Sequence, residues 1–147
     1  MKMSKQEYGE YVKKKSPHSS HGKNLALAFV IGGLICSFGQ ALTVFYTWFG
    51  LDKDTTSIAT SITLVFFGAF FTGLGLYDRL AKHAGAGTLV PITGFANSVA
   101  APALEFKTEG MITGMAAKMF IIAGPVIVFG VSASVVYGIV LVLLQRL

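Results

Sequence analysis

Polar and charged side chains gather between residues 91 and 123, in a stretch that is otherwise apolar. Ionisable groups inside a membrane cost several kcal/mol unless they are paired or hydrated, and they therefore tend to mark a pathway for ions or polar solutes. The candidate pathway or ligand residues are Thr93, Asn97, Ser98, Glu105, Lys107, Glu109 and Lys118.

The chemistry that these residues offer is binding of small ions. Helix N-termini after Pro91 and at Gly110 would direct backbone N–H groups toward an anion, with lysines assisting, and the glutamates would receive a cation. A plainer interpretation stays open, in which residues 105–109 form an ordinary aqueous loop and Lys118 extends to the membrane surface from the start of a last span.

Other reactive residue types form no site that we can identify. His18 and His21 have a metal-ligand spacing but no third ligand, and His83 is isolated. The Gly-Ala-Gly segment at 85–87 lacks the lysine of a phosphate loop and predicts a hinge or turn. Cys36 lies in an apolar run, where thiolate is scarce. We expect no enzymatic activity, no cofactor and no resident metal.

The elements that position these residues belong to a membrane protein. The chain has 147 residues, of which 53% are hydrophobic and 13% charged, whereas about a quarter of an ordinary soluble domain is charged. The net charge of +5 does not indicate nucleic-acid binding, because the lysines crowd into the first 23 residues beside apolar segments. They predict topology instead, with the N-terminus on the cytoplasmic side.

Two regular spans follow a basic tail. In the tail, residues 1–24, Ser4 and Glu7 have the spacing of a capping pair and predict a short interfacial helix over residues 4–15. The spans run over residues 25–49 and 58–77, and the second is expected to stop at Asp78 and Arg79. Residues 25–147 then form a single transmembrane helical domain.

The rest of the chain is interrupted by prolines. Between Pro91 and Pro102 only about 15 Å of helix fits, roughly half of a bilayer core. The Gly124-Pro125 step divides a later apolar run into a half-helix over 110–123 and a full span over 125–144. We therefore predict a small all-α polytopic protein with about three full spans and an interrupted or re-entrant segment at 89–123. As an alternative, residues 89–104 form a poor full span.

Small residues at a spacing of four mark expected helix contacts. They occur in the first span, after the charged turn, and in the last span. The predicted packing residues are Gly33, Ser37, Gly110, Gly114, Gly130, Ser134 and Gly138.

Four stretches together resemble the stage V sporulation protein AC family (SpoVAC/SpoVAEB) of spore-forming bacteria. They are GGLICSFGQAL at 32–42, FTGLGLYDRLAKHAGAG at 71–87, VPITGFANSVAAPALEFKTEG at 90–110 and KMFIIAGPVIVFGVSASVVYG at 118–138. In order, they span nearly all of the chain after residue 24.

The resemblance implies an integral membrane subunit of the SpoVA complex in the spore (forespore) inner membrane. Its cargo would be dipicolinic acid, largely as the calcium chelate, loaded in sporulation and released at germination. Its partners would be other SpoVA membrane subunits, notably the AEB homologue, and the soluble AD subunit, in an oligomer within the lipid bilayer.

Three functions remain open at this point. The chain would form a channel, opened by bilayer tension, or it would be a non-conducting subunit that assembles the complex and docks soluble partners. The third function is a membrane-embedded enzyme or ion-coupled transporter. It is disfavoured because three or four spans in one chain enclose little volume.

Overall fold

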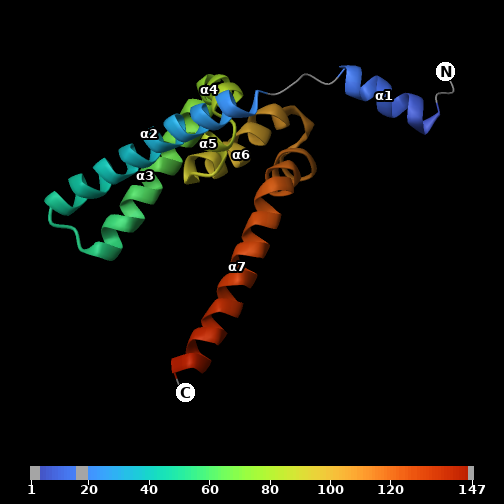
Figure 1. Ribbon diagram of the computed structural model, residues 1–147. Helices are drawn as coiled ribbons and strands as arrows, with labels where there is room; N and C mark the ends of the chain where they lie inside the picture. The colour runs from blue at the N-terminus through green and yellow to red at the C-terminus, as the bar shows by residue number, and fades with distance from the viewer. Residues whose placement is uncertain (1–3, 16–19, 146–147) are drawn as a thin grey trace.

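The computed structural model describes residues 4–15 and 20–145, and every regular element in these two ranges is a helix (Figure 1). This confirms the predicted all-α fold. The elements are α1 (Lys5–Lys15), α2 (His21–Trp48), α3 (Lys53–Gly73), α4 (Leu76–Ala84), α5 (Ala86–Leu89), α6 (Ile92–Glu105), the 3₁₀ turn η1 (Lys107–Glu109), the π-helical η2 (Met111–Ala116) and α7 (Ala117–Gln145).

Three helical segments in the described part of the chain are long and apolar enough to cross a membrane. They are α2, α3 and the run of 35 residues from Met111 to Gln145. In contrast, α6 has 14 residues and reaches only about 21 Å, short of a hydrocarbon core of about 30 Å. The chain therefore has three candidate spans and one segment too short to cross.

The tail helix α1 begins with the expected capping pair. The backbone N–H of Ser4 donates to the Glu7 carboxylate at 2.8 Å, and the backbone N–H of Glu7 donates to Ser4 Oγ at 3.3 Å. These hydrogen bonds, the backbone one first, hold the pKa of Glu7 below its ordinary value. All the described residues of the tail are exposed.

The helices α2 and α3 form an antiparallel pair, joined by a short turn (Figure 1). Gly50 takes a positive φ of 85° in that turn, which only glycine adopts without strain. Asp52 then caps α3 by accepting hydrogen bonds from the backbone N–H groups of Asp54 and Thr55. For this reason α3 starts at Lys53, ahead of its hydrophobic segment.

The predicted end of the second span was wrong. The helix α3 stops at Gly73, and Asp78 and Arg79 lie inside the separate helix α4. The break comes from Gly75, whose φ of 67° is left-handed and turns the chain between the two helices. The left-handed conformation of Gly75 therefore ends α3, and the charged residues Asp78 and Arg79 come after the break.

The segments α5 and α6 fold back against the end of the α2–α3 pair that lies away from its turn. In α5, Gly87 packs against the backbone of Ala28 and Gly32 in α2. In α6, Thr93 lies against Gly68 and Asn97 against Thr72, so α6 runs in the same direction as α3 along their contact. The chain thus enters the bundle at α5 and returns with α6 to the end where α3 finished.

Of the four predicted helix breaks, only the one at Pro91 is present. Pro91 is the N-cap of α6, and α5 has already ended at Leu89. Pro102 lies inside α6 and Pro125 inside α7, which also carries Gly124. A proline inside a helix removes one donor, and helices in membranes tolerate that loss when neighbouring groups compensate.

The division of the last apolar run was therefore wrong. A separate half-helix over 110–123 and a span over 125–144 are replaced by one helical run from Met111 to Gln145. Its irregular part is the π-helical turn η2 at the start, which begins after Gly110 at a φ of 101°. The change of direction after α6 comes from this turn (Figure 1).

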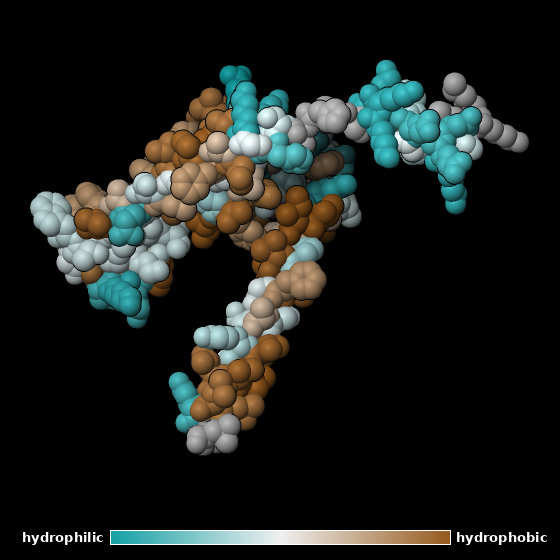
Figure 2. Space-filling model, viewed as in Figure 1, coloured by the Kyte–Doolittle hydropathy of each residue, from teal (hydrophilic) through white to brown (hydrophobic). Residues whose placement is uncertain are grey.

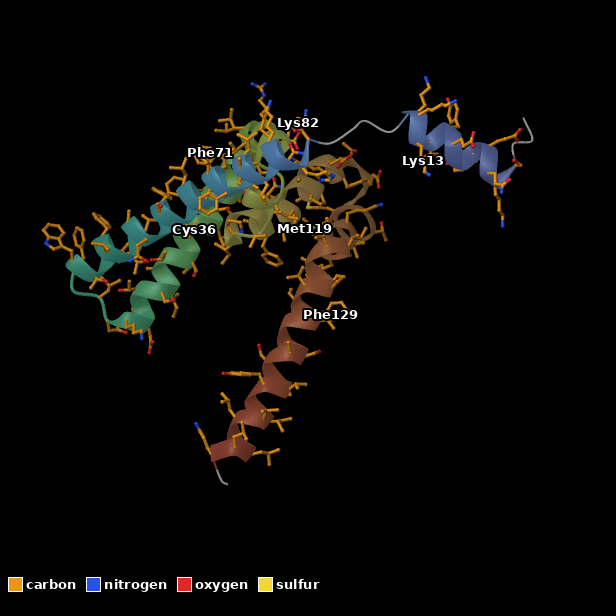
Figure 3. The ribbon with its side chains drawn as sticks, viewed as in Figure 1. Lys13, Cys36, Phe71, Lys82, Met119 and Phe129 are labelled. Carbon is orange, nitrogen blue, oxygen red and sulfur yellow. The ribbon has the colours of Figure 1, made fainter. Side chains whose placement is uncertain are left out.

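The helix α7 leaves the other helices after its first turns. In Figure 3, Met119 lies near the corner between α6 and α7, whereas Phe129 lies farther along α7, with no other helix drawn beside it. Phe129 is 74% exposed, and the residues from Pro125 to Gln145 are exposed apart from Gly138, which is half-buried. Most of α7 makes no contact that would hold it in place within one chain.

The predicted packing stripes do not form the helix contacts of this chain. Gly33 and Ser37 are exposed, and a Cβ on Gly33, Gly130 or Gly138 would meet nothing within 4 Å. Ser134 is exposed and donates only to Gly130 O in its own helix, at 2.9 Å. Gly110 lies in the turn, and Gly114 packs against Glu109 of that same turn. The glycines that do bring helices together are Gly32, Gly39, Gly68, Gly87 and Gly94.

Candidate functional site

A buried polar cluster joins α4, α5 and α6. Tyr77 is 6% exposed, and its hydroxyl donates to the Thr88 carbonyl at 2.7 Å and lies 3.0 Å from Thr93 Oγ1. Thr88 is 2% and Thr93 6% exposed. A buried carbonyl at the end of a four-residue helix would otherwise lack a partner, so Tyr77 satisfies the backbone where the helices break.

A second polar contact joins α3 to α6. Thr72 Oγ1 lies 2.8 Å from Asn97 Oδ1 and 2.7 Å from the carbonyl oxygen of Gly68. The single hydrogen of the Thr72 hydroxyl lies within reach of two acceptors, one in its own helix and one in the neighbouring amide. Ser98, by contrast, donates to Phe95 O at 2.8 Å and is satisfied inside α6. Of the two adjacent polar residues, Asn97 faces the neighbouring helices.

A cavity of about 420 Å³ lies beside these contacts. Its polar lining comes from Tyr77, Thr88 and Asn97, and Gly85 and Gly94 shape its wall. Gly85 takes a φ of 48° between α4 and α5, so the turn expected in the Gly-Ala-Gly segment lies at its first residue, whereas Ala86 and Gly87 begin α5. We call Thr72, Tyr77, Thr88, Thr93 and Asn97 the junction cluster.

The charged candidates lie elsewhere, in the turn between α6 and α7. Glu105, Lys107 and Glu109 are exposed. Lys118 is half-buried, and its Nζ lies 4.7 Å from the centroid of the Phe106 ring, within the range of a cation–π interaction. Lys118 therefore packs on the turn and does not reach Thr93 or Asn97.

The seven predicted site residues thus fall into separate groups. Thr93 and Asn97 belong to the junction cluster, Ser98 is satisfied locally, and the four charged residues surround the turn. Sequence reasoning missed Thr72, Tyr77 and Thr88. The one available signal was that a tyrosine and two threonines flank the broken helices, but their partners are up to 25 residues away.

The remaining candidates stay apart from this site. His83 bonds the Arg79 carbonyl oxygen at 3.1 Å within α4. His21 begins α2, and His18 lies outside the described residues. Cys36 is exposed on α2 (Figure 3).

Three apolar helices of spanning length, with a polar cluster where shorter helices break against them, define a polytopic α-helical integral membrane protein. The chain matches the family model of the SpoVAC/SpoVAEB sporulation membrane protein over residues 24–140. It belongs to that family, which confirms the resemblance found in the sequence.

One curated relative is similar along almost the whole chain. The chain is 44% identical to Stage V sporulation protein AC of Bacillus subtilis (strain 168), over 97% of this chain and 96% of that protein. No solved structure matches the chain.

Proposed function

We propose that this protein is a channel subunit of the SpoVA system, which moves dipicolinic acid or its calcium chelate across the spore inner membrane. Its partners in this proposal are the other SpoVA membrane subunits, including the AEB homologue, and the soluble AD subunit. Family membership supports the place in sporulation. The cargo, the partners and the role in germination are parts of the proposal.

The observation that carries the proposal is the junction cluster and its cavity. Hydroxyl and amide groups gather beside about 420 Å³ of space where α4, α5 and α6 break against one another. Irregular backbone at membrane depth is tolerated where protein or a water-filled space satisfies its polar groups. A small dicarboxylate can accept a hydrogen bond from the Asn97 amide in the cavity wall. Chelated calcium prefers carboxylate oxygens such as those of Glu105 and Glu109.

The test compares two adjacent residues of α6. We expect Asn97→Ala to slow dipicolinate release from germinating spores at least about tenfold, on the scale of about 1.4 kcal/mol per factor of ten, because the variant removes a polar group from the cavity wall. Ser98→Ala is the matched control, because the Ser98 hydroxyl is already bonded inside its helix. It should release dipicolinate normally.

Charge in the turn is tested in the same assay. Glu105→Ala and Lys118→Ala should alter release while the protein remains in the membrane, as measured by immunoblotting of membrane fractions. If Asn97→Ala, Glu105→Ala and Lys118→Ala all release dipicolinate at the normal rate, residues 91–123 do not line the path.

The exposed length of α7 favours a second candidate function, a non-conducting subunit that assembles the complex. Reconstitution of the purified protein in liposomes distinguishes the channel function from the assembly function. Purified protein in liposomes should release trapped dipicolinate, or pass current when suction is applied to the membrane. Sealed liposomes at all tensions would support the assembly role.

A further inference from the structure

A second polar region lies at the opposite end of the α2–α3 pair, next to its turn. A cleft of about 470 Å³ opens between the two helices, lined by Thr43 and Thr47 from α2 and by Lys53, Ser57, Thr60 and Ser61 from α3. The hydroxyls of Thr43 and Thr60 lie 3.3 Å apart at its base, where Thr60 is 9% exposed. We call this the hydroxyl cleft.

Gln40 extends the hydroxyl cleft toward the middle of α2. It lines a second hollow of about 360 Å³ that shares Thr43 and Thr47 with the cleft. Gln40 precedes Trp48 by eight residues, about 12 Å along the helix, and tryptophan marks the membrane interface. The amide of Gln40 therefore lies at the depth of the hydrocarbon core.

The hydroxyl groups alone would not require water. Thr43 donates to Gly39 O at 3.0 Å, Thr47 to Thr43 O at 2.8 Å and Ser61 to Ser57 O at 2.9 Å, so each is satisfied by its own helix. The amide of Gln40 is different. It is exposed, and no side-chain hydrogen bond in the described part of the chain includes it. An amide without a partner is strongly disfavoured in hydrocarbon, so this face meets water or polar groups.

Exposed apolar side chains of α3 lie next to the residues that line the cleft. Ile58 and Ile62 in α3 are 61% and 64% exposed and are neighbours of Ser57 and Ser61 in the sequence. Figure 2 shows pale and teal atoms gathered over the turn end of the α2–α3 pair, whereas much of the pair farther from the turn is brown. In α3, Ser57 and Ser61 line the cleft, whereas Ile58 and Ile62 are exposed outside it, as expected where one face meets water and the next meets lipid.

A positive charge at the hydroxyl cleft favours anionic solutes. Lys53 is the charged side chain among the described residues that line it. The carboxylates of the flanking Asp52 and Asp54 do not line the cleft. Asp52 keeps its negative charge at the start of α3, where it accepts hydrogen bonds from the Thr55 hydroxyl at 2.6 Å and from the backbone N–H groups of Thr55 and Asp54. The Lys53 ammonium group in the lining favours a carboxylate oxygen.

We propose that the hydroxyl cleft is a water-filled vestibule that admits small carboxylate anions. It forms the mouth of the path on the side opposite the junction cluster, with Gln40 at its inner limit. The inference rests on the proposed channel, because it adds a second lined region on α2 and α3. Its test measures access of water and anions, and does not depend on flux.

Cysteine labelling of the full chain in liposomes tests the vestibule, in a Cys36→Ala background. Only the hydrated thiolate reacts with a charged thiosulfonate, so the labelling rate reports water at each position. Ser57→Cys and Ser61→Cys are compared with Ile58→Cys and Ile62→Cys, which lie at matched depths. We expect the two cleft positions to react at least about tenfold faster, a difference of about 1.4 kcal/mol.

The charge preference is measured with the same variants. An anionic sulfonatoethyl reagent should label Ser61→Cys faster than a cationic trimethylammonium reagent, and Lys53→Ala should abolish that preference. Pyridine-2,6-dicarboxylate, added as a probe, should slow labelling.

Each outcome has one meaning. Equal, slow labelling of Ser61→Cys and Ile62→Cys would overturn the vestibule, even if the liposomes release dipicolinate. Fast labelling without preference for the anionic reagent would overturn its anion selectivity. Fast, anion-selective labelling in liposomes that release no dipicolinate would leave the vestibule standing and count against the proposed channel.

Discussion

Individual glycines set how closely the helices of this protein approach. A Cβ at Gly68 would lie 2.9 Å from the Thr93 carbonyl oxygen and 3.0 Å from Ala96 Cβ, so α3 and α6 are separated by backbone alone at that point. Gly73, in the same helix, has open space around it. Close approach at Gly68 is what brings Thr72 within hydrogen-bond distance of Asn97 one turn later.

This pair of glycines gives a matched prediction. Gly68→Ala should destabilise the protein by about 1–3 kcal/mol, because the added methyl group has no room and pushes α6 away from α3. Gly73→Ala should be neutral or slightly stabilising, because alanine favours the helix. Thermal unfolding in detergent, followed by circular dichroism, compares the two. Equal midpoints for Gly68→Ala and wild type would mean that α6 does not pack on α3 at Gly68.

At the scale of elements, the turn between α6 and α7 controls where the last helix points. Gly110 combines a φ of 101° with a ψ of 155°, a region that is essentially open only to glycine. The π-helical turn η2 follows at once, with the Met115 backbone N–H donating to Gly110 O at 2.9 Å. Lys118 then packs on the ring of Phe106, which precedes η1.

The conformation of Gly110 predicts the effect of a side chain there. Gly110→Ala should strain the turn by about 1–3 kcal/mol and open it locally. Trypsin should then cleave after Lys107 several-fold faster than in the wild type, as measured by mass spectrometry of the fragments. Gly130→Ala, in the exposed part of α7, is the control and should not change the rate, since a Cβ there meets nothing within 4 Å.

At the scale of the whole molecule, the three candidate spans and the folded-back segment determine which loops lie on the same side of the membrane. The α2–α3 turn lies at one end, and the turn after α6 lies at the other, beside the start of α2 (Figure 1). Because α6 runs parallel to α3 and is too short to cross, Glu105 returns to the end where α3 finished.

The arrangement predicts the labelling side of three lysine positions, each changed to cysteine in a Cys36→Ala background. Lys23→Cys and Lys107→Cys should react with an impermeant maleimide only from the cytoplasmic side, and Lys53→Cys only from the other side. Spheroplasts and inverted vesicles provide the two sides. Labelling of Lys107→Cys from the same side as Lys53→Cys would mean that residues 89–104 cross the membrane after all.

The sequence by itself determined the helical class, the three apolar runs and the capping pair of α1, because hydrophobic length and capping are local properties of the chain. Only the tertiary structure decided which faces pack and which prolines break a helix. Gly32 and Gly33 are equally small, yet only Gly32 faces α5. Pro91 lies at the boundary before α6, whereas Pro125 lies inside α7. The Thr72–Asn97 contact joins residues 25 positions apart. Such choices depend on which surfaces meet in space, and spacing along one helix does not contain that information.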